Sequence, residues 1–232
     1  MKFVARTHIG LIRSSNQDAL LLTPALCGVA DGMGGHKAGD VASQTTVTKL
    51  SQVLCDATPA EDLLRGAIEE CNSFVYEMQL SNPDYRGMGT TATILWEEKD
   101  AMLLGHVGDS RAYLLRDGCL RQISEDHSLV NEMVQQGVLT KEQARIHPYR
   151  NVITRAVGTD PFVKVDVLQI EKKPGDIWLL CSDGLSNEVQ DDALAETLKN
   201  PDLEKAADAL LEMALNAGGH DNISFVIAEV CL

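Results

Sequence analysis

Residues 26–35 read Leu-Cys-Gly-Val-Ala-Asp-Gly-Met-Gly-Gly. An apolar run of this length that ends in a glycine-rich turn predicts a short buried strand. Asp31 stands where the apolar run ends, and Gly32 follows it directly. The stretch therefore places a carboxylate at the end of a strand, beside a small residue.

The same arrangement occurs again further along the chain. An aspartate beside a small residue adjoins an apolar run at Asp109 after residues 103–107, at Asp183 after residues 178–181 and at Asp221 before residues 223–227. A single Asp-Gly pair is typical of a tight turn. Several aspartates at strand ends can instead converge, and such a concentration of negative charge needs cations to stabilise it.

Carboxylate and carbonyl oxygens favour Mg²⁺ or Mn²⁺ over zinc, and the sequence has no matching cluster of cysteine and histidine. The pattern therefore predicts a site for more than one metal ion, which usually serves phosphate-ester hydrolysis. A second polar group, Arg13 with Asn16, Gln17 and Asp18, precedes an apolar run at residues 19–22. Arginine can hold a phosphate dianion through two hydrogen bonds, and the alternative is a solvated surface arginine.

The hydrophobic pattern predicts an α+β domain. Short β-branched or apolar segments predict strands at residues 26–30, 91–96, 101–107, 112–116, 163–170 and 177–181. Apolar residues at three- and four-residue steps predict helices over residues 63–78 and 203–215, and a third helix is expected over residues 38–54. Thr58 and Pro59 predict the N-cap and first residue of the 63–78 helix. Strand runs and helix runs segregate, which favours layers over a doubly wound parallel sheet.

Composition narrows the classes of protein. The chain has 232 residues, 20 of them basic and 34 acidic, for a formal net charge of −14, with 44% hydrophobic and 23% charged residues. These values fit one globular domain over residues 1–232 and exclude disorder and fibre. An acidic surface repels phosphate backbones, so no nucleic-acid partner is expected. No run approaches the ~20 apolar residues of a membrane span, so no membrane partner is expected.

A cytoplasmic protein is expected from two further features. No apolar run typical of a secretory signal follows Met1. The cysteines are scattered, with no C-x-x-C pair, which predicts buried reduced thiols at Cys27, Cys55, Cys71, Cys119, Cys181 and Cys231.

A series of short motifs runs through essentially the whole chain: Arg13-x-x-Asn16-Gln17-Asp18, Asp31-Gly32-Met33-Gly34-Gly35, Gly89-Thr90-Thr91, Gly108-Asp109-Ser110-Arg111, Asp126-His127-Ser128, Asp183-Gly184 and Asp221-Asn222. Each is weak alone. In this order they resemble the bacterial branch of the PP2C-type (PPM family) metal-dependent Ser/Thr protein phosphatases. The resemblance implies a β-sandwich of two antiparallel sheets flanked by helix pairs, with a flap insertion at roughly residues 128–159.

The resemblance also implies roles for individual residues. Asp31 would bridge two Mn²⁺ or Mg²⁺ ions, and the Gly32 carbonyl would help to hold one of them. Asp183 and Asp221 would hold the other. Asp109, with Asp183, would form a third, weaker metal site. Three further residues have implied roles. Asp18 would contact a metal ion through a water molecule, and Arg13 would bind the substrate phosphate. His147, in the flap, would contact the substrate.

The implied reaction is direct hydrolysis of phosphoserine or phosphothreonine in proteins by a water shared between two metals, without a protein nucleophile. Two positions depart from the family pattern. Met33 stands where eukaryotic members have a histidine that protonates the leaving group, and a thioether cannot do this. His36 is a nearby candidate for that acid, with a solvated loop histidine as the alternative. Gln17 replaces an acidic residue that some members use as a metal ligand.

The other histidines and the polar residues near the aspartates have structural interpretations. Arg111 is expected to pair with a carboxylate or with backbone carbonyls near the site, and His127 to be hydrogen-bonded. Ser110 lacks the base and carboxylate partners of a catalytic serine.

The sequence thus predicts an enzyme that opposes a bacterial Ser/Thr kinase, acts on phosphorylated proteins and is a monomer. Three alternatives stay open. One is a pseudophosphatase that binds phosphoproteins without turning them over. Another is a phosphatase of anti-sigma-factor antagonists, and the third is a small-molecule phosphatase.

Overall fold

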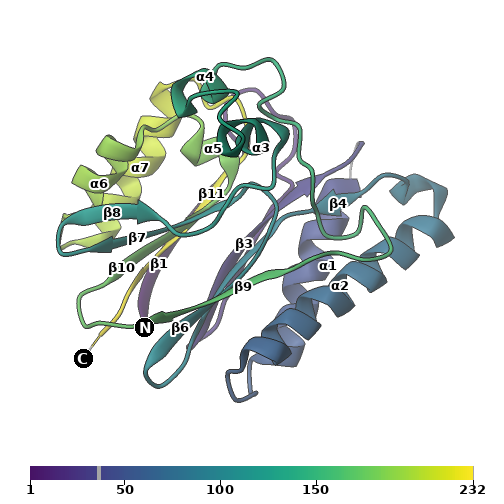
Figure 1. Ribbon diagram of the computed structural model, residues 1–232, viewed down its shortest axis with the longest axis horizontal. Coiled ribbons are helices and arrows are strands. Elements are labelled where there is room, and N and C mark those ends of the chain that lie inside the picture. The colour runs from purple at the N-terminus through teal and green to yellow at the C-terminus, as the bar shows by residue number, and fades with distance from the viewer. Residues whose placement is uncertain (36–37, 232) are drawn as a thin grey trace.

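The computed structural model describes residues 1–35 and 38–231. Two antiparallel sheets are packed face to face (Figure 1). The first sheet has the order β1 (Lys2–His8), β11 (Ile223–Glu229), β10 (Ile177–Cys181), β7 (Arg111–Arg116) and β8 (Cys119–Gln122). The second has the order β2 (Asp18–Leu22), β3 (Leu26–Met33), β5 (Ala92–Glu97), β6 (Ala101–Val107) and β9 (Asp166–Glu171), and β4 (Gly89–Thr90) pairs with the end of β3.

A pair of helices covers the outer face of each sheet. Helices α1 (Ala38–Leu54) and α2 (Glu61–Ser81) lie on the second sheet, and α6 (Asp191–Leu198) and α7 (Leu203–Asn216) lie on the first (Figure 1). The core therefore has three layers. Leu104, Leu180 and Val226 belong to the layer between the sheets, and the other two layers fill the spaces between each sheet and its helices.

Burial on both faces explains why the central strands read as continuous apolar runs. Every residue of β6 is buried, because one face of the strand meets the other sheet and the opposite face meets α2. The helices, by contrast, bury one stripe. In α7 the buried residues follow three- and four-residue steps: Leu203, Ala206, Ala207, Leu210 and Ala214. The predicted layered α+β sandwich with flanking helix pairs is confirmed.

Several predicted boundaries are confirmed and two are wrong. Strands β6 and β10 and helix α1 span the predicted residues. Thr58 is not an N-cap, because α2 begins at Glu61 and its N-cap is Ala60, which makes no side-chain capping bond. The acidic pair at the start of α2, Glu61 and Asp62, compensates by lying at the positive end of the helix dipole. The strand predicted from residue 163 begins at Asp166.

The sequence pattern missed β1, β8 and the two-residue β4. Strand β1 alternates exposed and partly buried positions, and it is held by a full antiparallel ladder with β11 that pairs Lys2 with Glu229 and His8 with Ile223. The prediction that the cysteines are buried is wrong for three of the six. All six are free, but Cys55, Cys119 and Cys231 are exposed.

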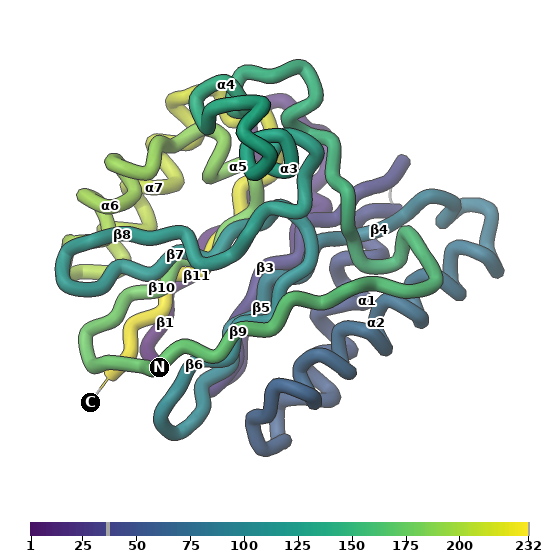
Figure 2. Tube along the Cα trace, in the orientation of Figure 1, coloured from purple at the N-terminus to yellow at the C-terminus, as the bar shows by residue number. Residues whose placement is uncertain are grey.

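The segment predicted as a flap insertion, roughly residues 128–159, is a surface excursion that contains α3 (Leu129–Gln135) and α4 (Lys141–Arg145). In the chain it follows β8 and precedes β9, and in space it runs over one end of the sandwich (Figure 2). An isolated bridge between Ser128 and Ile153 closes its base. The Arg145 guanidinium donates to the Ser186 carbonyl (3.0 Å), which ties the excursion to α5 (Asp183–Ser186).

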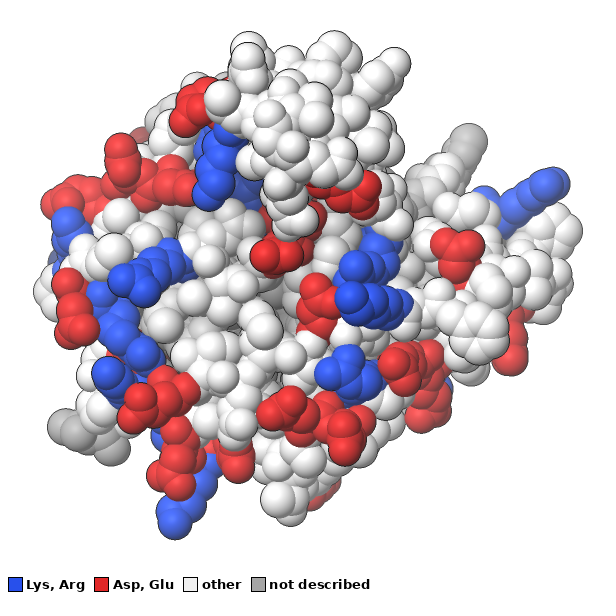
Figure 3. Space-filling view, in the orientation of Figure 1, with Lys and Arg blue, Asp and Glu red and all other residues white. Residues whose placement is uncertain are grey.

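The surface carries charges of both signs. On the face shown in Figure 3, lysine and arginine side chains are interspersed with aspartate and glutamate, and no continuous basic surface covers it. Among the described residues, no helix is long and apolar enough to cross a membrane.

Candidate metal centre

A cavity of about 210 Å³ collects most of the predicted site residues. It is lined by Arg13, Gln17, Asp31, Gly32, Met33, Gly34, Asp109, Asn151, Ile153, Asp183, Asp221 and Asn222. The four aspartates of the sequence pattern thus meet in one place, although they come from both sheets. The fold achieves this because the strands of the two sheets end at the same end of the sandwich.

Each aspartate is placed by a strand or by the turn that follows it. Asp31 lies on β3, directly across from Asp18 on β2. Asp183 is the first residue of α5 and follows β10, and Asp221 precedes β11 in the same sheet. Asp109 lies in the connection between β6 and β7.

The backbone of Asp31 is held by the conspicuous Gly89-Thr90-Thr91 motif. The Asp31 amide donates to Thr91 Oγ1 (2.8 Å), and the Asp31 carbonyl accepts from the Thr91 amide (2.9 Å) and Thr90 Oγ1 (2.9 Å). The next residue must be glycine. A Cβ at Gly32 would lie 2.1 Å from the Gly39 carbonyl oxygen and 2.5 Å from the Gln17 carbonyl oxygen.

The electrostatics of the site are those of crowded carboxylates. Burial, reinforced by the other aspartates, raises the pKa of Asp31 and of Asp109 well above the ordinary range. Burial raises the pKa of Asp183 to about 6, and Asp221 adds to this. Negative charge in this site is therefore under-compensated by the protein itself, and a cation would stabilise it.

Arg13 is the cation that contacts this group. Its Nη2 lies 2.6 Å from Asp221 Oδ2, and this hydrogen bond raises the pKa of the guanidinium. Asn222 positions the loop that carries Arg13. The Asn222 side chain donates to the carbonyls of Ile9 and Ser15 (both 2.9 Å) and accepts from the Gln17 amide (2.8 Å).

Asp18 lies behind the cavity and does not line it. Ser182 Oγ donates to its Oδ2 at 2.9 Å. Its Oδ1 is buried and has no protein partner. Burial raises the pKa of Asp18 to about 7. An unpartnered buried carboxylate oxygen next to Asp31 suits a carboxylate that acts through a water molecule.

The donor set fits hard divalent cations. Among residues 1–35 and 38–231, no three His, Cys, Asp or Glu side chains form a group that could hold an ion by themselves. Mg²⁺ and Mn²⁺ do not require such a group, because Mg²⁺ keeps several waters and takes one or two carboxylates, and Mn²⁺ prefers similar oxygen donors. The cavity offers carboxylate oxygens and the backbone of Gly32. These groups would suit divalent cations that share ligands and complete their coordination with water.

Other predicted residues have different placements. His147 does not line the cavity; its Nδ1 accepts from the Tyr149 amide (3.2 Å). His36 lies outside the described residues. Arg111 pairs with Asp126 through its Nε and Nη2 (2.9 and 2.7 Å), which confirms the expected contact with a carboxylate.

From the same excursion as His147, Asn151 and Ile153 line the cavity instead. Their sequence neighbourhood carries no pattern that would have distinguished them. Their position depends on the bridge between Ile153 and Ser128.

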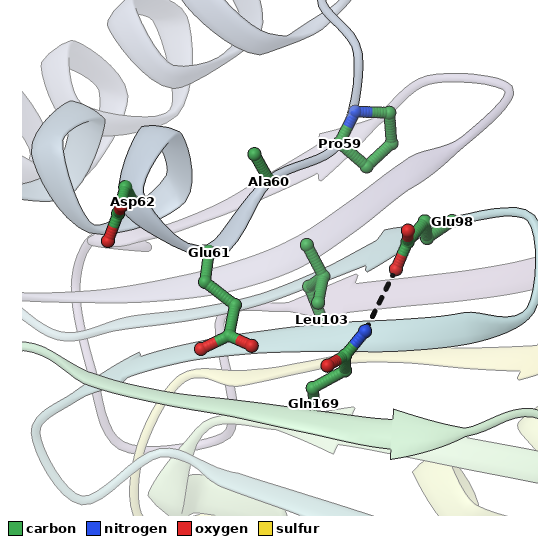
Figure 4. A pocket seen from close by; sticks show the side chains of 7 residues that line it. All are labelled: Pro59, Ala60, Glu61, Asp62, Glu98, Leu103 and Gln169. Atoms are coloured by element: carbon green, nitrogen blue, oxygen red, sulfur yellow. Dashed lines mark hydrogen bonds between the residues drawn. The ribbon is translucent and has the colours of Figure 1, made fainter.

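A second, larger cavity of about 440 Å³ lies between the start of α2, the β5–β6 turn and β9 (Figure 4). Its charged residues are Glu61, Asp62 and Glu98, and Gln169 Nε2 donates to Glu98 Oε2 (3.1 Å; Figure 4). It shares no lining residue with the aspartate cavity. Size alone therefore does not mark the chemical centre of this molecule.

Comparison with known proteins agrees with this geometry. Residues 12–218 match the family profile described as protein phosphatase 2C. The chain is 42% identical over 233 residues to the serine/threonine protein phosphatase PstP of Mycobacterium tuberculosis, covering 99% of this chain and 45% of that protein. It is 39% identical over 236 residues to the serine/threonine phosphatase stp of Listeria welshimeri, covering 97% and 94%.

The chain thus spans about half the length of the first of these curated relatives and nearly all of the second. A solved structure of the PstP catalytic domain in complex with two manganese ions superposes with a TM-score of 0.92, at 38% identity, over 100% of this chain and 98% of that one.

Proposed function

The chain belongs to the protein phosphatase 2C family, and on that basis we propose that it hydrolyses phosphoserine and phosphothreonine in proteins in a metal-dependent reaction. One observation carries the proposal. Asp31, Asp109, Asp183 and Asp221 line a single cavity together with Arg13. Burying several carboxylates together destabilises the fold, and bound cations would offset this by neutralising their charge.

The residues divide into metal ligands and a substrate-binding cation. Asp31 and the Gly32 carbonyl would hold one ion, with Asp31 shared by a second that Asp183 and Asp221 complete. Asp18 would act through water, which suits its unpartnered Oδ1. The relative PstP binds two manganese ions, which supports this count. We extend it to a third, weaker ion at Asp109 and Asp183, and to Mg²⁺ as well as Mn²⁺.

Bound cations would supply Lewis acidity and lower the pKa of water. The protein's own groups supply position and charge. Arg13 would hold the phosphate oxygens. To do so, its guanidinium must either leave Asp221 or bind Asp221 and the phosphate together. Met33 lines the cavity and cannot donate a proton, so this chain supplies no acid at that position.

The excursion at residues 128–159 would act as a flap over the substrate, as part of one catalytic domain over residues 1–232. Asn151 and Ile153 already lie at the cavity. His147 would reach the substrate only if the segment moved. Substrate choice would then rest on the flap and the cavity rim.

The substrates would be phosphoproteins, and a cognate Ser/Thr kinase would supply them. We propose action in the cytoplasm, which the free cysteines support, since such thiols persist in reducing compartments. We propose a monomer, as the family resemblance implies.

The test is hydrolysis of a phosphothreonine peptide by the purified protein with EDTA, Mg²⁺ or Mn²⁺, beside Asp183→Asn. Turnover that needs metal and is lost in the variant is expected. Binding of the phosphopeptide without turnover in any metal would instead indicate a pseudophosphatase. Turnover of small phosphate esters but not of phosphopeptides would indicate a small-molecule phosphatase.

A further inference from the structure

The turn that carries Asp109 is tightly enclosed on one side. Gly108 has φ +114°, a conformation that favours glycine, and a Cβ there would lie 2.5 Å from Thr91 Cγ2. Thr91 Oγ1 also lies 2.7 Å from Ser110 Oγ. Thr91 thus blocks the turn from one direction, but it makes no hydrogen bond to the backbone of Gly108 that would fix how far the turn extends toward the cavity.

His127 holds the other side of the same turn through both backbone groups of Gly108. The Gly108 amide donates to His127 Nδ1 (2.9 Å), and the His127 amide donates to the Gly108 carbonyl (2.8 Å). His127 is buried. One residue therefore satisfies both the donor and the acceptor of the residue that precedes Asp109.

The ring of His127 is itself oriented by charged partners. Its Nε2 lies 3.0 Å from Asp166 Oδ2 and 2.8 Å from Arg155 Nη1, and Arg155 Nη1 donates to Asp166 Oδ1 (2.9 Å). Since Gly108 donates to Nδ1, that nitrogen carries no proton. The proton of the neutral ring is then on Nε2 and points at the Asp166 carboxylate. Arg155 can only donate, so it makes no hydrogen bond to this nitrogen and acts through its bond to Asp166.

We propose that His127 is a positioning residue for the metal centre: its unprotonated Nδ1 anchors the Gly108 amide and so aims the Asp109 carboxylate into the cavity. The inference rests on the proposed function, because it concerns the affinity of that cavity for a divalent cation. His127 does not line the cavity, so it acts through Asp109 and not on the ion. Residues that orient metal ligands typically change metal affinity by roughly 10- to 100-fold when removed.

Two substitutions separate this role from simple packing. In His127→Asn, the side-chain amide can place an acceptor near the position of Nδ1 and keep the bond to Gly108. In His127→Gln, the longer amide reaches toward Asp166 and leaves the Gly108 amide without its acceptor. Both remove a buried imidazole. His106→Gln is the matched control, because His106 is buried beside His127 (ring centroids 4.8 Å apart) and makes its hydrogen bonds to Thr93 and Glu125 instead.

The measurement is Mn²⁺ binding to the full chain, followed by electron paramagnetic resonance of the free ion, with thermal unfolding recorded in EDTA. We expect His127→Gln to weaken the weaker class of Mn²⁺ sites roughly tenfold. We expect His127→Asn and His106→Gln to stay within about threefold of wild type. In an Asp109→Asn background, His127→Gln should have no further effect, since the two act as one unit.

An unchanged Mn²⁺ isotherm in a folded His127→Gln variant overturns the inference. So does equal weakening in all three variants, which would reflect lost stability. If the wild type itself binds no Mn²⁺, the proposed function fails before this question arises.

A measurement on the wild type covers the case in which no variant folds. Long-range proton–nitrogen NMR of His127 at neutral pH should show a protonated Nε2 and a bare Nδ1. The opposite tautomer, or a doubly protonated ring, overturns the inference.

Discussion

Arg13 Nη2 lies 2.6 Å from Asp221 Oδ2, so the cation expected to hold the substrate phosphate is paired with a carboxylate expected to hold a metal ion. The side chain of Arg13 is about half exposed. The same guanidinium can therefore turn from the carboxylate to a phosphate without crossing a packed core. The pairing supplies positive charge to a site that otherwise concentrates negative charge.

Removing Arg13 should act mainly on phosphorylated substrates. A hydrogen bond to a charged group contributes about 1.5–3 kcal/mol, which is roughly 10- to 150-fold in kcat/KM. Arg13→Ala should lose activity in this range through a raised KM, and Arg13→Lys should recover it only in part, because a point charge cannot bind two oxygens at once. Steady-state kinetics on a phosphothreonine peptide test this. A KM equal to that of wild type in Arg13→Ala would remove Arg13 from phosphate binding.

Substitution of the central aspartates should abolish activity while the fold persists. Asp31→Asn and Asp183→Asn should each lower kcat/KM by more than about 100-fold, since each removes a charged ligand and leaves the shape of the side chain. Phosphopeptide hydrolysis measures the loss, and far-ultraviolet circular dichroism checks the fold. Asp192→Asn, at an exposed position on α6, is the matched control and should retain wild-type activity. Wild-type rates in either site variant would contradict the assignment of these ligands.

Asp109 should affect the metal requirement more than the maximal rate. Asp109→Ala leaves Asp31, Asp183 and Asp221 in place, so activity should fall at limiting Mn²⁺ and approach that of wild type at saturating Mn²⁺. A titration of activity against free Mn²⁺, from about 1 μM to 10 mM, follows the half-saturation point, which we expect to rise roughly tenfold. An identical titration curve would exclude Asp109 from metal binding.

Acid should destabilise the fold through His106. Burial, together with His127, lowers the pKa of His106 from its ordinary 6.5 to about 4. Between these values the unfolded chain binds a proton that the folded chain excludes, so stability is fully present above about pH 6.5 and falls as the pH drops toward 4. The two values correspond to at most about 3 kcal/mol. Asp126 and Asp166, which also face the ring, favour the proton, and the pKa of about 4 already includes their effect.

The measurement is the urea midpoint in EDTA at pH 7.5 and pH 5. Wild type should lose more stability between the two than His106→Gln does, and subtracting one from the other removes the contribution of the site aspartates. Equal losses in the two proteins would show that His106 is not the acid-sensitive group.

Asp176 should be important for stability. It is 1% exposed and accepts from Arg116 Nε (2.7 Å), Arg116 Nη2 (2.6 Å) and the Lys173 amide (2.8 Å). Asp176→Asn removes the charged partner of Arg116, whose Nη2 keeps its hydrogen bond to the Glu171 carbonyl (2.6 Å), and this should cost about 3 kcal/mol.

For a chain of this size that loss corresponds to a Tm lower by roughly 6–12 °C. Glu196→Gln breaks the exposed pair with Lys199 and should change stability by less than about 0.5 kcal/mol. Differential scanning calorimetry of both variants compares them. Equal effects would mean that burial does not strengthen the inner pair.

Most of the strands and the long helices could be predicted from local sequence patterns. Strands β6 and β10 read as apolar runs, interrupted only by His106 in β6, because they are largely buried on both faces, and α7 shows its buried stripe in its spacing. Strand β1 escaped detection because its polar alternation is weak evidence alone and its ladder with β11 joins the two ends of the chain. The N-cap of α2 escaped because capping depends on where the backbone turns, and Thr58 lies two residues too early.

Sequence alone identified the residues that we expect to carry the chemistry. Aspartates that adjoin short apolar runs are a local pattern, and the order of the motifs along the chain identifies the family. How they meet depends on the fold, which brings Asp31 from one sheet to Asp183 and Asp221 from the other, and places Asn151 and Ile153 of the excursion at the cavity in place of His147. The reason is physical. A strand's end is set by its own residues, but which ends share a cavity depends on the packing of two sheets whose contacts join residues more than a hundred positions apart, as Arg13 and Asp221 do.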